Sequence, residues 1–184
     1  MSLSTQLIDS NSVGYSTFQS NSQRCVVNDG GIFKIHVHST SGGTFNNQIW
    51  YLQRSIDDGR TFTTVYSNTT YDYVPCLETD SSSNLYLIYT FDATNAKFLK
   101  FSNTNYIDPS IITNIPIILS SKFCMTLDDT NNKIYYFNSR GYLTMLNKSG
   151  AITTTETQIT QAGAIASNMY PSVTLDNNGN VYYA

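Results

Sequence analysis

Apolar and polar residues alternate along most of this chain in short runs, and a period of two is typical of half-buried β-strands. Asp, Asn, Ser and Gly fill the intervals between these runs and favour turns. No window shows a convincing apolar period of about 3.6 residues, so no helix is predicted. The pattern predicts strands over residues 25–28, 32–38, 48–54, 61–66, 76–79, 85–91, 97–102, 111–119, 124–127, 133–137, 142–147 and 153–159.

This strand pattern recurs with a steady period. Cys25, Cys76, Cys124 and Ser172 head four similar segments and stand 51, 48 and 48 residues apart. An Asp follows each of them four residues later, and a polar turn then leads to an aromatic residue. Self-similarity at such a period indicates a repeat architecture. The small residue that heads each segment predicts a buried packing position, since free cysteine behaves as a small hydrophobe.

Four short antiparallel strands in about 50 residues form the unit of a β-propeller blade. We therefore predict an all-β fold, a single β-propeller domain over residues 1–184 with four-stranded antiparallel blades. The repeat units cover about 22–70, 73–119 and 121–168, and an incomplete unit covers 169–184. A strand-like segment at 5–8 precedes the first unit. About three and a half blades would leave open strand edges, so we expect a fragment of a longer propeller or closure of the ring by self-association.

The first unit also carries a recognisable motif between its third and fourth strands. The segment Ser55-Ile56-Asp57-Asp58-Gly59-Arg60-Thr61-Phe62 matches S-x-D-x-G-x-T-[FW]. It resembles the Asp-box of the sialidase-like BNR repeat propellers, and the repeat as a whole is similar to that family. Only degenerate copies occur at 102–105 and 147–150. The resemblance implies that Ser55, Asp57, Gly59, Thr61 and Phe62 are structural and lie on the face opposite an active site.

Composition narrows the classes of function. Charged residues make up 12% of the chain and the net charge is −3 with no basic run, which argues against nucleic-acid binding. No apolar stretch approaches the roughly 18 residues of a membrane helix. The three cysteines form no metal-ligand spacing, so neither a metal nor a cofactor is expected. The location of the protein stays unknown: no signal peptide is recognisable, and an extracellular or virion-surface location is compatible with the sequence.

If the Asp-box marks one face, ligand binding belongs on the other. That face is formed by the loops between units and by those between the second and third strands of each unit. Arg24 stands at the start of a first strand, where a guanidinium could pair bidentately with a carboxylate or phosphate; a solvated surface arginine is the alternative. The binding candidates on this face are Arg24, Asp72, Tyr73, Lys122 and Tyr170.

The leading hypothesis is a non-catalytic binding or scaffold propeller whose partner is a glycan. Enzymes of the family that this chain resembles use three arginines to hold the sugar carboxylate, a Tyr nucleophile supported by a Glu, and an Asp that acts as acid and base. This chain has four arginines, of which Arg54 precedes the box and Arg60 lies within it, and only two glutamates. No catalytic residue is therefore predicted, and enzymatic activity stays uncertain. Two alternatives remain: a fragment of a sialidase-like glycoside hydrolase, and a phage or cell-surface structural or adhesion protein.

Overall fold

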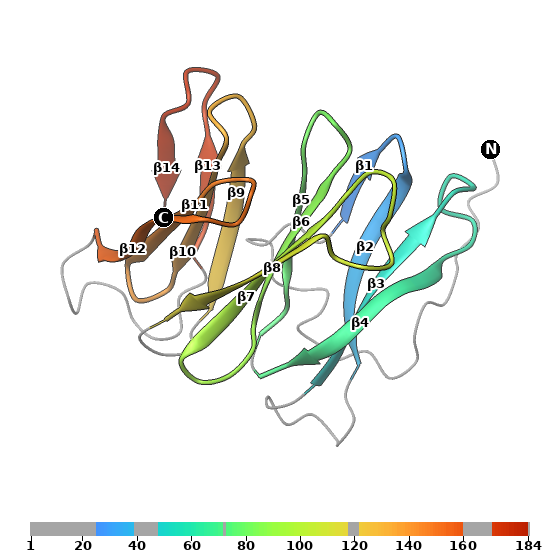
Figure 1. Ribbon diagram of the computed structural model, residues 1–184, viewed down its shortest axis with the longest axis horizontal. Helices are drawn as coiled ribbons and strands as arrows, with labels where there is room; N and C mark the ends of the chain where they lie inside the picture. Colours follow the sequence, from blue (N-terminus) through green and yellow to red (C-terminus); the bar gives the residue numbers. More distant parts are fainter. Residues whose placement is uncertain (1–24, 39–47, 72, 118–121, 160–170, 184) are drawn as a thin grey trace.

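The computed structural model describes residues 25–38, 48–71, 73–117, 122–159 and 171–183. Within these residues the chain forms strands, turns and loops without a helix, so the all-β prediction is confirmed. Three sheets contain four antiparallel strands each, joined in chain order, and a fourth contains two (Figure 1).

The strand bounds are as follows. The first sheet comprises β1 (Cys25–Asn28), β2 (Gly31–His38), β3 (Gln48–Ser55) and β4 (Thr63–Thr70). The second comprises β5 (Cys76–Thr79), β6 (Leu85–Thr90), β7 (Asn95–Phe101) and β8 (Ile111–Pro116). The third comprises β9 (Phe123–Asp128), β10 (Lys133–Asn138), β11 (Tyr142–Leu146) and β12 (Ile152–Gln158), and the last comprises β13 (Val173–Leu175) and β14 (Val181–Tyr183).

The predicted strands are found, with ends that shift by a few residues. The largest shift is at β4, which runs on through the polar residues 67–70. Alternation does not mark these residues, but their backbone pairs with β3 as far as Gln48↔Thr70. The strand-like segment predicted at 5–8 lies outside the described residues. Backbone pairing therefore extends a strand where side-chain pattern alone ends it.

Successive sheets pack face to face. The first strand of each sheet adjoins the first strand of the next, in the order β1, β5, β9 and β13. One apolar cluster fills the space between the first and second sheets and includes Trp50 and Leu87; another lies between the second and third and includes Ile88 and Tyr136. Because the second sheet is covered on both faces, every residue of β6 is buried, whereas β2 alternates between buried and half-buried positions.

The buried position predicted for the cysteines holds for two of the three. Cys76 and Cys124 are buried, and the Cys76 thiol lies 3.8 Å from the carbonyl oxygen of Phe123 in the third sheet. Cys25 and the equivalent Ser172 are exposed, so the prediction is wrong at these two positions. Val26 is the β1 residue that packs into the cluster between the first and second sheets. Strand alternation then turns Cys25 to the other face of β1.

Two tyrosines between the second and third sheets give a matched pair of stability tests. The Tyr86 hydroxyl donates to Asp80 Oδ2 at 2.7 Å, whereas the Tyr136 hydroxyl is buried without a hydrogen-bond partner among the described residues. We expect Y86F to lower the free energy of unfolding by about 1–2 kcal/mol, because a buried carboxylate loses a donor. We expect Y136F to be neutral or to raise it by up to about 1 kcal/mol.

Urea unfolding of both variants measures the difference directly. The two substitutions remove the same atom from two fully buried rings. Equal losses of stability in Y86F and Y136F would contradict the assignment of an unpaired hydroxyl to Tyr136.

Candidate functional site

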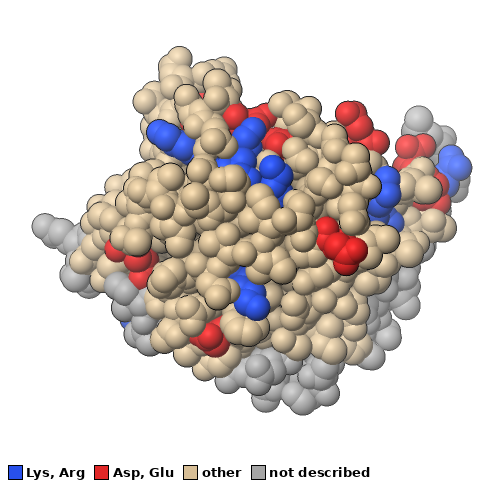
Figure 2. Space-filling model, in the orientation of Figure 1, with Lys and Arg blue, Asp and Glu red and all other residues tan. Residues whose placement is uncertain are grey.

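Hairpin turns and the loops between the third and fourth strands gather at one end of the strands. The turns join the first and second strands of each sheet, and all four project in the same direction (Figure 1). We call this region the turn end; it consists of the turns at residues 29–30, 80–84, 129–132 and 176–180 and the loops β3–β4 (56–62), β7–β8 (102–110) and β11–β12 (147–151). Charged side chains gather along this end of the molecule, and both signs are present (Figure 2).

Two of the turns are closed by an Asp in the same way. Asp80 Oδ1 accepts from the backbone N–H of Ser82 at 3.0 Å and of Asn84 at 2.8 Å, and the Asn84 amide donates to both carboxylate oxygens. Asp176 repeats this arrangement, with backbone donors at 2.9 and 2.8 Å and the Asn180 amide at 2.7 Å. The repeated Asp is therefore a turn-former, which binds its own backbone in place of solvent.

The first turn uses a different residue. Asn28 Oδ1 accepts from the Gly30 N–H at 2.8 Å, and Asn28 Nδ2 donates to Thr79 Oγ1 of the second sheet at 2.9 Å. The Asp29 N–H donates to Ser83 Oγ. This turn has only two residues between paired strands, so the polar side chain that closes it stands one position earlier than the repeat predicts.

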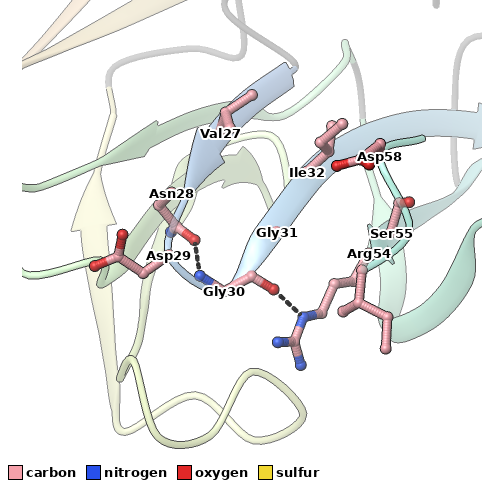
Figure 3. A pocket seen from close by; sticks show the side chains of 10 residues that line it. Val27, Asn28, Asp29, Gly30, Gly31, Ile32, Arg54, Ser55 and Asp58 are labelled. Atoms are coloured by element: carbon pink, nitrogen blue, oxygen red, sulfur yellow. Dashed lines mark hydrogen bonds between the residues drawn. The ribbon is translucent and has the colours of Figure 1, made fainter.

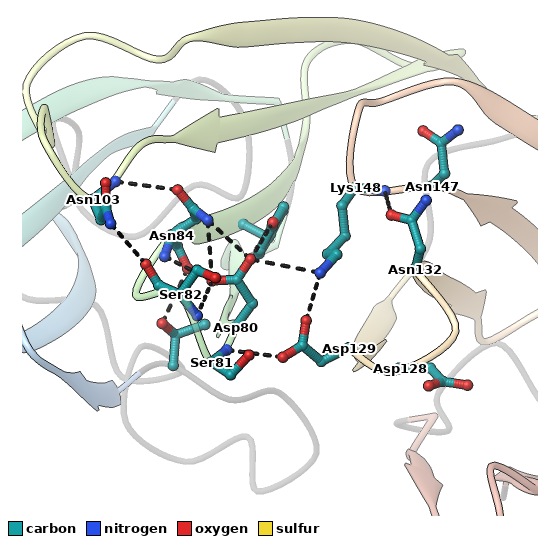
Figure 4. Close-up of polar contacts among 12 residues, drawn as sticks. Asp80, Ser81, Ser82, Asn84, Asn103, Asp128, Asp129, Asn132, Asn147 and Lys148 are labelled. Atoms are coloured by element: carbon teal, nitrogen blue, oxygen red, sulfur yellow. Dashed lines mark hydrogen bonds and ion pairs between the residues drawn. The ribbon is translucent and has the colours of Figure 1, made fainter.

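A lysine ties the second and third turns together (Figure 4). Lys148 Nζ donates to Asp129 Oδ1 at 2.6 Å and lies 3.8 Å from Asp80 Oδ2, and the Ser81 N–H donates to Asp129 Oδ2 at 2.9 Å. The hydrogen bond from Lys148, with those from Ser81, lowers the pKa of Asp129 to about 2. Burial opposes ionisation of Asp80, yet the hydrogen bonds from Asn84 and Tyr86 hold its pKa below the usual value. The ionised network links two sheets.

The loop that matches the Asp-box is closed by its own side chains. Thr61 donates its hydroxyl to Asp57 Oδ2 at 2.6 Å and its N–H to Oδ1 at 2.9 Å, and the Ser55 hydroxyl donates to Asp57 Oδ1 at 2.7 Å. These bonds, that of the Thr61 hydroxyl first, lower the pKa of Asp57 to about 2. Gly59 donates to Ser55 Oγ with a φ of +82°, a conformation that favours glycine. Phe62 lies under the ammonium of Lys34, 3.5 Å from its ring centre.

A groove of about 540 Å³ separates the third and fourth turns, and we call it the Asp–Asn groove. Hydrogen bonds from Asn180 lower the pKa of Asp176, so this carboxylate is held ionised. Asp128 on the opposite wall accepts from the backbone and side-chain amides of Asn131 at 3.0 and 2.8 Å. Tyr182 is 56% exposed, and its hydroxyl approaches Asp176 Oδ2 at 3.3 Å. The groove is lined by Leu127, Asp128, Asp129, Thr130, Asn131, Leu175, Asp176, Asn177, Asn178 and Gly179.

Ligand binding was predicted on the face away from the Asp-box loop, whereas the Asp–Asn groove lies at the turn end together with that loop. Two of the five predicted ligand-binding residues lie within the described residues, and neither lines this groove. Arg24, Asp72 and Tyr170 lie outside the described residues. Tyr73 and Lys122 precede β5 and β9, at the end of these strands opposite the turns. Tyr73 is half-buried, and its carbonyl accepts from the Thr70 hydroxyl at 3.0 Å; the carbonyl of Lys122 accepts from Ser139 N–H at 2.7 Å. These two residues stand in different inter-sheet connections.

The groove residues were visible in the sequence only as turn-formers. The recurrence of Asp with Asn three or four residues later marks the turns at 128–131 and 176–180. That signal does not reveal that two turns 48 residues apart lie side by side. Packing of β9 against β13 brings them together.

Comparison of the chain with protein-family models, with curated proteins and with solved structures finds no match. Within the described ranges, no three His, Cys, Asp or Glu side chains are grouped so that they could hold a metal ion. The same part of the chain contains no helix with the length and apolar character needed to cross a membrane.

Proposed function

We propose that this chain is a non-catalytic, glycan-binding scaffold of the β-propeller type. The propeller arrangement is supported by the four-stranded sheets in chain order and by the succession of neighbouring first strands β1, β5, β9 and β13. The resemblance to Asp-box propellers is supported by the loop at Ser55–Phe62, whose motif side chains bond to one another.

The Asp–Asn groove is the observation that carries the binding function. Sugar hydroxyls both donate and accept hydrogen bonds, and carboxylates and amides supply the complementary groups. Asp128 and Asp176 are already held by their own turns, so little side-chain freedom is lost when a ligand binds. Exposed Tyr182 adds an aromatic surface beside Asp176, on which the apolar face of a sugar ring can pack.

The state of the groove carboxyls favours binding over catalysis. Hydrolysis of a glycosidic bond requires a carboxylic acid that keeps its proton near neutral pH. Hydrogen bonds lower the pKa of both Asp129 and Asp176. Glu78, whose pKa is raised by burial, stands on β5 and does not line this groove. Ionised acceptors suit the recognition of hydroxyl groups.

A matched pair of charge-removing substitutions tests this function. Asp176 and Asp92 each accept hydrogen bonds from the backbone and from an Asn side-chain amide in an exposed turn, but only Asp176 lines the groove. A glycan array identifies a ligand, and calorimetric titration then compares the variants. We expect D176N to weaken binding by about tenfold, since a charge-assisted hydrogen bond is lost, and D92N to retain wild-type affinity.

Two results would overturn the proposal. The first is an array without a bound glycan at high protein concentration. The second is an equal loss of affinity in D176N and D92N, which would show that the groove does not hold the ligand.

A further inference from the structure

A second groove at the turn end, of about 430 Å³, lies between the β1–β2 turn and the β3–β4 loop (Figure 3). We call it the Arg54 groove, because Arg54 is the one cationic side chain among its lining residues. Arg54 Nε donates to the carbonyl of Gly30 at 2.6 Å, as the dashed line in Figure 3 shows. This bond fixes the position of the guanidinium.

Aromatic rings hold the same guanidinium from the side. Its carbon lies 5.0 Å from the ring centre of Tyr106 and 5.7 Å from that of Phe33. Tyr106 is itself held in place, because it is buried and its hydroxyl donates to the carbonyl of Ser83 at 2.8 Å. Its ring packs so closely on Gly30 that an added Cβ would stand 2.6 Å from it. The arginine is thus pre-organised, which reduces the entropy lost when it binds a ligand.

The guanidinium keeps unused donors. Arg54 forms no ion pair with an Asp or Glu of the described residues, and the ion pairs of Lys148 with Asp80 and Asp129 do not involve it. With Nε committed to Gly30, the terminal nitrogens of Arg54 remain available as a fork. A fork of this kind matches the two oxygens of a carboxylate.

The other walls of the groove restrict the ligand further. Val27 and Ile56 line it and are 69% and 80% exposed, which gives the groove an apolar side. Asp29 and Asp58 also line it, so a ligand with several negative charges would meet repulsion. These features favour one negative charge joined to a small aliphatic group.

We propose that the Arg54 groove binds a monovalent organic carboxylate with a branched aliphatic substituent. The Arg54 fork pairs with the carboxylate, and the aliphatic group covers Val27 and Ile56. This site is separate from the Asp–Asn groove and does not depend on the glycan-binding function.

Titration of the whole chain, followed through the arginine Nε–Hε signals in ¹H–¹⁵N NMR spectra, tests the site. The probes are 3-methylbutanoate, acetate and inorganic phosphate, compared at constant ionic strength near pH 8, where carboxylates are ionised. We expect saturable shifts of the Arg54 signal with 3-methylbutanoate, weaker binding of acetate and the weakest binding of phosphate. Arg60, which does not line the groove, serves as the internal control.

Two variants separate binding from folding. R54Q lacks the Arg54 signal and is therefore followed by calorimetric titration; it should weaken 3-methylbutanoate binding by about tenfold or more, but it also removes the bond to Gly30. I56N leaves every contact of Arg54 in place and should weaken binding of the same probe by about fivefold while acetate binds as before. I107N, at a residue 63% exposed and outside the groove, is its matched control.

The proposal is overturned by any of three outcomes. These are unsaturable or absent shifts at Arg54, shifts of Arg60 as large as those of Arg54, and unchanged affinity for 3-methylbutanoate in I56N. Phosphate binding tighter than 3-methylbutanoate would likewise contradict the assigned ligand class.

Discussion

Replacement of Asp80 by alanine is expected to lower the free energy of unfolding by about 3–5 kcal/mol, the range of a broken buried network. Asp80 is 7% exposed and accepts hydrogen bonds from Ser82, Asn84 and Tyr86. Its loss leaves the Tyr86 hydroxyl buried without an acceptor and removes one of the two carboxylates near Lys148. Urea unfolding at neutral pH measures the change.

Asp176 supplies the control for this prediction. It closes the fourth turn with the same backbone and Asn bonds, but the turn is exposed and adjoins a two-stranded sheet. We expect D176A to lower the free energy of unfolding by about 1 kcal/mol or less. Equal losses in D80A and D176A would show that the stability comes from the turn alone and not from the link between sheets.

The second large effect is expected at Glu78. Burial on β5 raises the pKa of this carboxyl from 4.5 to about 7. The folded state therefore retains a proton that the unfolded state releases between about pH 4.5 and 7, and stability falls as the pH rises through that window. At pH 8 the free energy of unfolding of E78Q should exceed that of the wild type by about 3 kcal/mol, since the pKa rises from 4.5 to about 7 and one pKa unit corresponds to about 1.4 kcal/mol.

Unfolding free energies at about pH 5 and pH 8 check this expectation. The wild type should lose stability when the pH is raised from about 5 to 8, and E78Q should not. The control is E156Q, which replaces the other glutamate; Glu156 lies on β12 and accepts from Asn138 Nδ2 at 2.9 Å. This variant should lose as much stability as the wild type between the two pH values, because Glu78 is still present. A destabilised E78Q at the higher pH would show that the glutamate is stabilised in its ionised form.

Local chemistry explains which features could be read from the sequence. A strand with one buried face must alternate, so the period of two located the strands of the first three sheets. Turns rich in Asp, Asn and Gly close on their own backbone, so Asp57, Asp80 and Asp176 could be recognised as turn-formers before any tertiary contact was considered. These interactions join residues within about six positions of each other.

Contacts between distant residues decided the rest. The repeat aligned Cys25 with Cys76 and Cys124, but only packing of neighbouring sheets determines which face of β1 is covered, and it covers Val26. Exposure of Cys25 is therefore not visible in the repeat.

The grooves also depend on tertiary structure. Asp128 and Asp176 belong to turns 48 residues apart, and Arg54 meets Tyr106 only because the first two sheets stack. The sequence by itself determined the strands, the turns and the antiparallel order of each unit, because these follow from neighbours along the chain. The tertiary structure alone decided which turns face each other, because stacking of sheets joins residues that no local pattern relates.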